Sequence, residues 1–114
     1  MGRQHISLLA LTVNAAGALN PHRFVGHDGN TAVAAGNALG VARTAAAIGE
    51  DLAVDVIGTA IVEAGGAISA GAEIEVGADG VAVTKNAGVT VARIAPGESA
   101  SAAGELIEVL LIAN

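Results

Sequence analysis

The chain has 114 residues, a formal net charge of −6 and no cysteine. This length is enough for one domain, and the lack of cysteine excludes disulfides, thiolate zinc sites and cysteine nucleophiles. The five Lys and Arg residues are scattered along the sequence, so no basic cluster is available to displace the counterions of a nucleic acid. We therefore expect no nucleic-acid partner.

The composition predicts a thin hydrophobic core. Hydrophobic residues make up 53% of the chain, but Phe, Tyr and Trp together make up only 1%, and Phe24 is the single one of these residues. Many of the apolar residues are alanines, which remove little apolar surface from water when they are buried. Such a chain gains stability by burying surface against copies of itself or against another protein.

Residues 1–13 are predicted to form an N-terminal arm and a first strand, the strand covering Ile6–Val13. A signal peptide is the alternative, with Arg3 as its basic segment, but the apolar run is at the short limit for one. No apolar run in the sequence approaches the ~20 residues of a membrane-spanning helix. We therefore expect no membrane partner.

The stretch "PHRFVGHDGN" at Pro21–Asn30 concentrates the polar chemistry of the chain. We interpret it as a strand over Arg23–Gly26 followed by a hairpin turn at the Asp-Gly pair. In a regular strand His22 and His27 point to opposite faces, so they do not supply the convergent ligands that a metal site needs. The ring of Phe24 is expected to anchor one edge of the core.

Glycine-bounded segments rich in Val, Ile and Leu dominate the rest of the sequence. Period-two alternation is clearest over 51–63, and the final segment is expected to bury Leu106, Val109 and Leu111. The alanine-rich region is predicted to form strands with one short helical turn at 44–48. The further predicted strands cover residues 31–35, 39–43, 89–95 and 105–114, with two more around an Ala-Asp-Gly turn in 73–84, and a loop covers 14–21.

These strands predict an all-β fold: a small single-domain β-barrel or sandwich of short strands with an N-terminal arm. Residues 14–114 then form the β-rich domain that follows the arm and first strand.

No catalytic set is visible in the sequence. The serines Ser7, Ser69, Ser99 and Ser101 do not lie in a nucleophile elbow, and the Asp-Gly pairs lack the spacing of an EF-hand. We therefore predict no enzymatic activity, no catalytic residue, no metal site and no cofactor.

Lys85 supports one alternative function. It lies in "VAVTKNAGVTVA", at the apparent tip of a hairpin between two valine-rich strands. Small all-β carrier domains present a lysine in this way for biotinyl or lipoyl attachment, although a lysine also commonly solubilises a hairpin tip. The residues beside it, Thr84 and Asn86, differ from those usual in carriers. A lysine-modified carrier domain is therefore the second hypothesis.

Several segments, in this order, resemble the capsid cement, or head decoration, proteins of tailed bacteriophages. Each segment alone is ordinary for a β protein, and the order is more specific. The similarity extends from Arg23 to the C-terminus and is weakest in residues 1–20. The segments are "RFVGHDGN", "LGVARTAAAIGEDLAVDVIGTAIVEAGGAISAGAEIEV", "ADGVAVT" and "AGELIEVLLI".

The resemblance implies a structural protein on the outer surface of the virion capsid, made in the host cytoplasm. It implies binding to the major capsid protein, with neighbouring subunits clamped so that the expanded head is stabilised, and a homotrimer at the binding position. A small extracellular or fibre-like binding module is a third possibility. We expect Gly2, Arg3, Gln4 and His5 to contact the capsid or a neighbouring copy, with Arg3 pairing with an acid there.

Overall fold

The structure is a computed structural model that describes residues 6–112. Within this range the chain forms strands joined by turns, with one short 3-10 turn, η1. The elements are β1 (Ser7–Asn14), β2 (Phe24–Val25), β3 (Gly40–Ala42), β4 (Asp51–Glu63), β5 (Glu73–Val76), η1 (Ala78–Gly80), β6 (Ala82–Thr84), β7 (Ala92–Ile94) and β8 (Leu106–Leu111).

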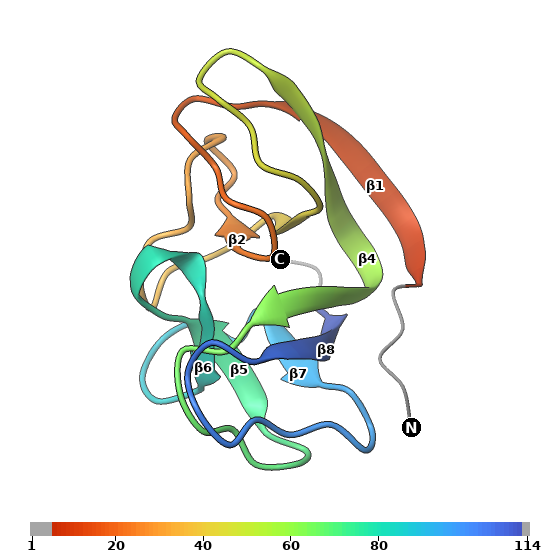
Figure 1. The fold of residues 1–114 in the computed structure, drawn as a ribbon, viewed down its shortest axis with the longest axis vertical. Coiled ribbons are helices and arrows are strands. Elements are labelled where there is room, and N and C mark those ends of the chain that lie inside the picture. The colour runs from red at the N-terminus through yellow and green to blue at the C-terminus, as the bar shows by residue number, and fades with distance from the viewer. Residues whose placement is uncertain (1–5, 113–114) are drawn as a thin grey trace.

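Seven of these strands form a nearly closed, barrel-like sheet in the order β2-β3-β4-β8-β7-β5-β6. β1 lies outside this path and pairs with β4. Each pairing between named strands is antiparallel. The predicted all-β fold of short strands is therefore confirmed (Figure 1).

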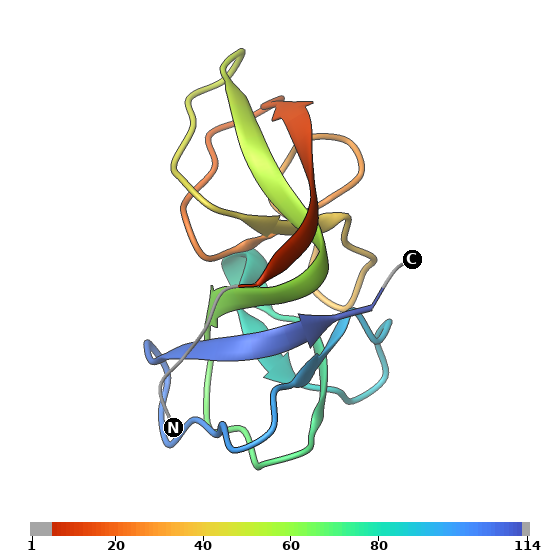
Figure 2. The ribbon, with the colours of Figure 1, turned by 90° about the vertical axis from the view of Figure 1, so that its right-hand side faces the viewer.

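The long strand β4 joins the two halves of the molecule, as the two views show (Figures 1 and 2). Its first part pairs with β1 and β3, and residues 59–63 pair with β8. Gly58 lies where the pairing changes, with a φ of +108°. A Cβ atom there would lie 2.2 Å from the carbonyl oxygen of Ile6, so a side chain at this position would collide with the chain entering β1.

Two hydrophobic clusters fill the two halves, and the hairpin of β2 and β3 contributes to both. Phe24 and Val41 belong to the larger cluster, whereas Val25 and Ala42 belong to the smaller one. This division follows from the alternation of side chains along a strand. Phe24 is only 1% exposed, which confirms its predicted place in the core.

Two local predictions in the alanine-rich region are wrong. Residues 31–35 do not form a strand: Thr31 makes a single bridge to Val25, and Ala35 turns away with a φ of +61°. Residues 44–48 do not form a helical turn, because Ala46 exchanges both backbone hydrogen bonds with the distant Leu19. Long-range pairing has overridden the helix propensity of alanine here.

The last strand is confirmed, but one of its predicted core residues is wrong. Val109 is fully buried and Leu111 packs against the larger cluster. Leu106 is 38% exposed, because it has the opposite parity in the strand and its side chain points to the other face. Ile107 is the buried residue at this end of the strand.

Candidate functional site

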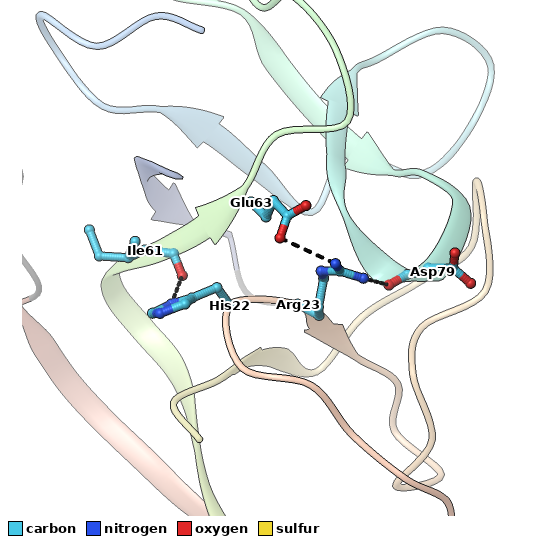
Figure 3. A network of polar contacts seen from close by, with 5 residues as sticks. All are labelled: His22, Arg23, Ile61, Glu63 and Asp79. Atoms are coloured by element: carbon cyan, nitrogen blue, oxygen red, sulfur yellow. Dashed lines mark hydrogen bonds and ion pairs between the residues drawn. The ribbon is translucent and has the colours of Figure 1, made fainter. Parts of the chain in front are cut away.

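His22 and Arg23 form structural ties between segments that are distant in sequence (Figure 3). The ring Nδ1 of His22 lies 3.2 Å from the carbonyl oxygen of Ile61 in β4. Arg23 donates from Nη2 to Glu63 at 3.2 Å and from Nη1 to the carbonyl oxygen of Asp79 at 3.0 Å. The two side chains thus connect the start of β2 to β4 and to η1.

The backbone of His22 is held in an unusual conformation by its neighbours. Its φ is +61°, in the left-handed region that L residues seldom adopt. Its amide donates to the carbonyl of Ala42 at 3.0 Å, and its own carbonyl accepts from the amide of Glu63 at 2.9 Å. Bonds on both sides therefore stabilise this conformation.

His27 and Asp28 lie in the predicted turn, which is confirmed. The amide of Gly26 donates to the carbonyl of Asn30 at 2.8 Å, and Gly29 has a φ of +85°. The Asp28 carboxylate accepts from the amide of Asn30 at 3.0 Å and from its side chain at 3.3 Å. These bonds lower the pKa of Asp28, so its charge stabilises the turn.

A cavity of about 130 Å³ is lined by residues of β3 and β4, among them a buried charge that the sequence pattern did not reveal. Asp55 is 2% exposed, and its carboxylate accepts from Nε of Arg43 at 2.8 Å. No hydroxyl or thiol side chain is among the described residues that line the cavity. Its lining residues are His22, Val41, Ala42, Arg43, Asp55 and Ile61.

Across residues 6–112, no three His, Asp or Glu side chains lie together in a group that could hold a metal ion. In the same part of the chain, no helix has the length and apolar character needed to cross a membrane.

The predicted hairpin around Lys85 is wrong. β6 and β7 both pair with β5, on its opposite edges, and so they do not pair with each other. Lys85 therefore begins a crossover, and its amide donates to the carbonyl of Glu73 at 2.8 Å. Because the strand order removes the hairpin tip, the geometry expected of a carrier lysine is absent.

The crossover after Lys85 is held by a carboxylate. Oε1 of Glu75 accepts from the amides of Asn86 at 2.7 Å and Gly88 at 2.9 Å. These two bonds, with the positive charge of Lys85, lower the pKa of Glu75. The backbone of this crossover is therefore held by the Glu75 carboxylate at two amide groups close to Lys85.

Exposed aliphatic side chains lie along β1 and on β4 beside it. Here the β1 strip means the side chains of Ile6, Leu8, Leu9, Leu11 and Ile57, all of which are exposed. Ile57 lies opposite Leu9 in the pairing of β1 with β4. No charged residue lies between Ile6 and Asn14. An exposed apolar surface of this kind is typical of protein–protein contacts.

The four predicted contact residues, Gly2, Arg3, Gln4 and His5, lie outside the described residues. The sequence pattern predicted the strand that follows them but not the exposure of its side chains. The sequence feature that could have indicated this exposure is the run of leucines without a charged residue in this outer strand.

Comparisons with known proteins agree with this fold. A family model described as phage cement protein matches residues 3–111. A solved structure described as the crystal structure of head fiber gp8.5 N base in bacteriophage phi29 has a TM-score of 0.72 and 21% sequence identity, and the match covers 91% of this chain and 93% of that chain. At this identity the likeness concerns the fold. The search of curated proteins finds no match.

Proposed function

The chain belongs to the phage cement protein family, and from this premise we propose that it binds the outer surface of the phage capsid and stabilises the expanded head by clamping neighbouring major capsid protein subunits. Family membership makes it a structural protein associated with the capsid of the virion. We propose in addition that it binds the outer surface, that its partner is the major capsid protein, and that it acts by clamping neighbouring subunits.

The family match over residues 3–111 carries this proposal, because it includes nearly the whole described fold. The character of the surface supports it. The polar side chains of the Pro21–Asn30 stretch are used in ties and in a turn, while the aliphatic side chains of the β1 strip are exposed. A protein that acts by contact needs such a surface and needs no catalytic set.

Clamping acts by mass action. A protein that binds the assembled shell, and not its separate subunits, shifts the equilibrium toward the intact shell. Many copies, each with a modest contact, then resist the internal pressure of packaged DNA. The net charge of −6 disfavours adhesion to that DNA.

We also propose that the attached protein is a homotrimer. Its support is the thin core with a single aromatic residue, together with the exposed aliphatic side chains of the β1 strip. Burying these side chains against other copies would add stability that one chain does not obtain alone.

The N-terminal arm is the remaining part of the proposal. Gly2, Arg3, Gln4 and His5 are proposed to reach a neighbouring copy or the capsid, and residues 14–114 to form the decoration domain behind the arm and first strand. The start of β1 is fixed to β4: the amide of Ile6 donates to the hydroxyl of Thr59 at 2.9 Å. An arm beginning here starts from an anchored point.

Co-sedimentation with expanded, empty heads tests the function. The protein should pellet with expanded heads at a saturable number of copies and should leave unexpanded heads unbound. The same heads should then unfold at a higher temperature in a calorimetric scan. Binding that leaves the head transition unchanged would contradict clamping, and a failure to pellet with expanded heads would contradict capsid attachment.

A further inference from the structure

We propose that the β1 strip is the surface through which copies of this chain contact one another. This inference rests on the self-association part of the proposed function and names its surface. Capsid attachment is a separate property, and the experiment below measures it separately.

The side chains of the β1 strip are exposed to solvent. Leu8 is 73% exposed, and the other four members of the β1 strip are exposed as well. A buried aliphatic side chain contributes roughly 1.5–3 kcal/mol relative to an exposed one. The other four members are between 42% and 51% exposed, so part of their apolar surface is still available for burial, in a chain whose core is mainly alanine and valine.

β1 also lies at an edge of the sheet. Among the described strands β1 pairs only with β4, so its other edge faces outward. Proteins usually protect such edges with charges, prolines or very short strands. The eight residues of β1, "SLLALTVN", contain neither a charge nor a proline. The sequence therefore leaves this edge open to another chain.

The charge of the chain favours a second copy as the partner of the β1 strip. Every copy carries a net charge of −6, so two copies repel each other over most of their surfaces. The segment from Ile6 to Asn14 carries no charge. The charge of Asp55 beside it is balanced by Arg43, and Asp51 lies at the far end, where it accepts from the side chain of Asn14. The β1 strip is thus a surface where identical acidic chains can approach with little repulsion.

The backbone of the β1 strip is fixed in place before any contact is made. Ile6 and Thr59 exchange two hydrogen bonds, from the amide of Ile6 at 2.9 Å and to its carbonyl oxygen at 2.8 Å. At the other end, Asn14 donates to the carbonyl oxygen of Gly49 at 2.9 Å. Because β1 is anchored at both ends, little backbone entropy is lost when a partner binds.

The absence of cysteine from the sequence makes a site-specific test possible. Leu8→Cys places the only thiol of the chain on the β1 strip. Ile48→Cys is the matched control, because Ile48 is 72% exposed on a loop outside the strip. For both variants the rate of maleimide modification is measured over a series of protein concentrations, with the mass in solution followed by analytical ultracentrifugation. The same rates are measured on heads at sparse and at full occupancy.

The proposal expects the thiol of Leu8→Cys to become about tenfold less reactive as copies associate, which corresponds to about 1.4 kcal/mol. This protection should rise with the mass in solution or, where association requires the head, with occupancy of the head. The thiol of Ile48→Cys should keep its reactivity throughout. The double variant Leu8→Asp with Leu11→Asp should shift the mass toward the monomer.

Three results would overturn the proposal. Equal reactivity of the Leu8→Cys thiol under every condition would show that nothing covers the strip. Protection on heads that is already complete for isolated copies at sparse occupancy would make the capsid the partner. Protection in dilute monomers that disappears when residues 2–5 are deleted would show that the chain covers its own strip. Co-sedimentation of the aspartate variant reports capsid attachment independently, so loss of self-association and loss of attachment are distinguished.

Discussion

Asp55 shows how one buried charge fits into a thin core. It lies in the middle of β4, almost without exposure, with Arg43 as a charged partner at 2.8 Å. A carboxylate in such a place is tolerated only when it is paired and hydrogen-bonded. The guanidinium reaches the carboxylate because Ala42, next to Arg43, pairs with Val54, next to Asp55.

Replacing Arg43 by Met should lower the free energy of unfolding by about 1–3 kcal/mol, because the Asp55 carboxylate then loses its cationic partner while it remains buried. Urea denaturation followed by circular dichroism measures the change. Arg93→Met is the matched control: Arg93 is exposed and donates to the carbonyl oxygen of Gly71 at 3.3 Å, so its loss should cost much less. An equal loss of unfolding free energy in the two variants would show that the buried ion pair stabilises the protein no more than the exposed contact of Arg93.

The carboxylate of Glu75 should make stability depend on pH in the acid range. Its pKa is lowered in the folded protein by the amides of Asn86 and Gly88 and by Lys85. The folded state therefore binds fewer protons than the unfolded state as pH falls through this range. This contribution is complete above the unfolded pKa of about 4.3 and is lost as pH falls through the folded pKa.

Glu75→Gln tests this dependence, because the amide keeps the shape and one acceptor oxygen but not the charge. The variant should be less stable than the parent at neutral pH, and the difference should shrink in acid. Urea unfolding at several pH values measures it. A difference that is constant from neutral pH into acid would show that the charge of Glu75 does not stabilise the crossover.

At the scale of elements, β4 determines the shape of the molecule. One strand serves both halves because its pairing changes from β1 and β3 to β8 along its length. The change requires close approach of the chain before β1 to Gly58. A glycine in the middle of a strand, which ordinarily weakens it, is here the condition for the bend.

Gly58→Ala should therefore lower the free energy of unfolding by about 1–3 kcal/mol, because the added Cβ collides with backbone atoms at a positive φ. Thermal unfolding by calorimetry measures the loss. Gly66→Ala is the matched control, since a Cβ atom there meets nothing within 4 Å. The proposed role of Gly58 fails if both alanine variants melt like the parent.

β8 offers a test of side-chain alternation with a pair of aspartates. Val109→Asp should prevent folding, because it places an unpaired charge at a fully buried position in a protein of marginal stability. Leu106→Asp should fold, because position 106 is 38% exposed and a carboxylate there keeps contact with water. Circular dichroism and the dispersion of amide proton signals distinguish the outcomes. Two folded variants would mean that β8 does not line the core, and two unfolded variants would mean that the exposure of Leu106 is wrong.

At the scale of the whole molecule, the proposed function assigns the stability of the fold and attachment to the capsid to different parts of the chain. The two hydrophobic clusters comprise residues from Ala15 onward, with Val13 packed at their margin. The arm proposed at Gly2–His5 precedes this core. Its removal and the disruption of the core should therefore produce different defects.

Deleting residues 2–5 should leave the melting temperature nearly unchanged while weakening attachment to expanded heads. The physical reason is that an arm contributes contacts only when a partner is present. Calorimetry of the free protein and co-sedimentation with heads give the two readouts. Attachment as strong as that of the parent would contradict a role for the arm, and a large fall in melting temperature would assign these residues to the fold.

The sequence by itself determined the features that depend on local chemistry. The alternation over 51–63 predicted β4, the Asp-Gly pair predicted the turn at Asp28, and the Ala-Asp-Gly segment predicted the connection between β5 and β6. In the two turns the interacting residues are neighbours in the chain, and in β4 the alternation of side chains is itself a local pattern, so each is readable without the fold. The family resemblance was likewise present in the order of the segments, and the match over residues 3–111 confirms it.

Only the tertiary structure decided the features that depend on which distant strands meet. The pairing of Ala46 with Leu19 replaced a helical turn, and the position of β5 between β6 and β7 removed the hairpin around Lys85. The burial of Asp55 beside Arg43 and the exposure of the β1 strip follow from the same strand order. Period-two alternation gives two faces for every strand, but the partners across each face are chosen by long-range packing, and that choice determines which residues are available for contact.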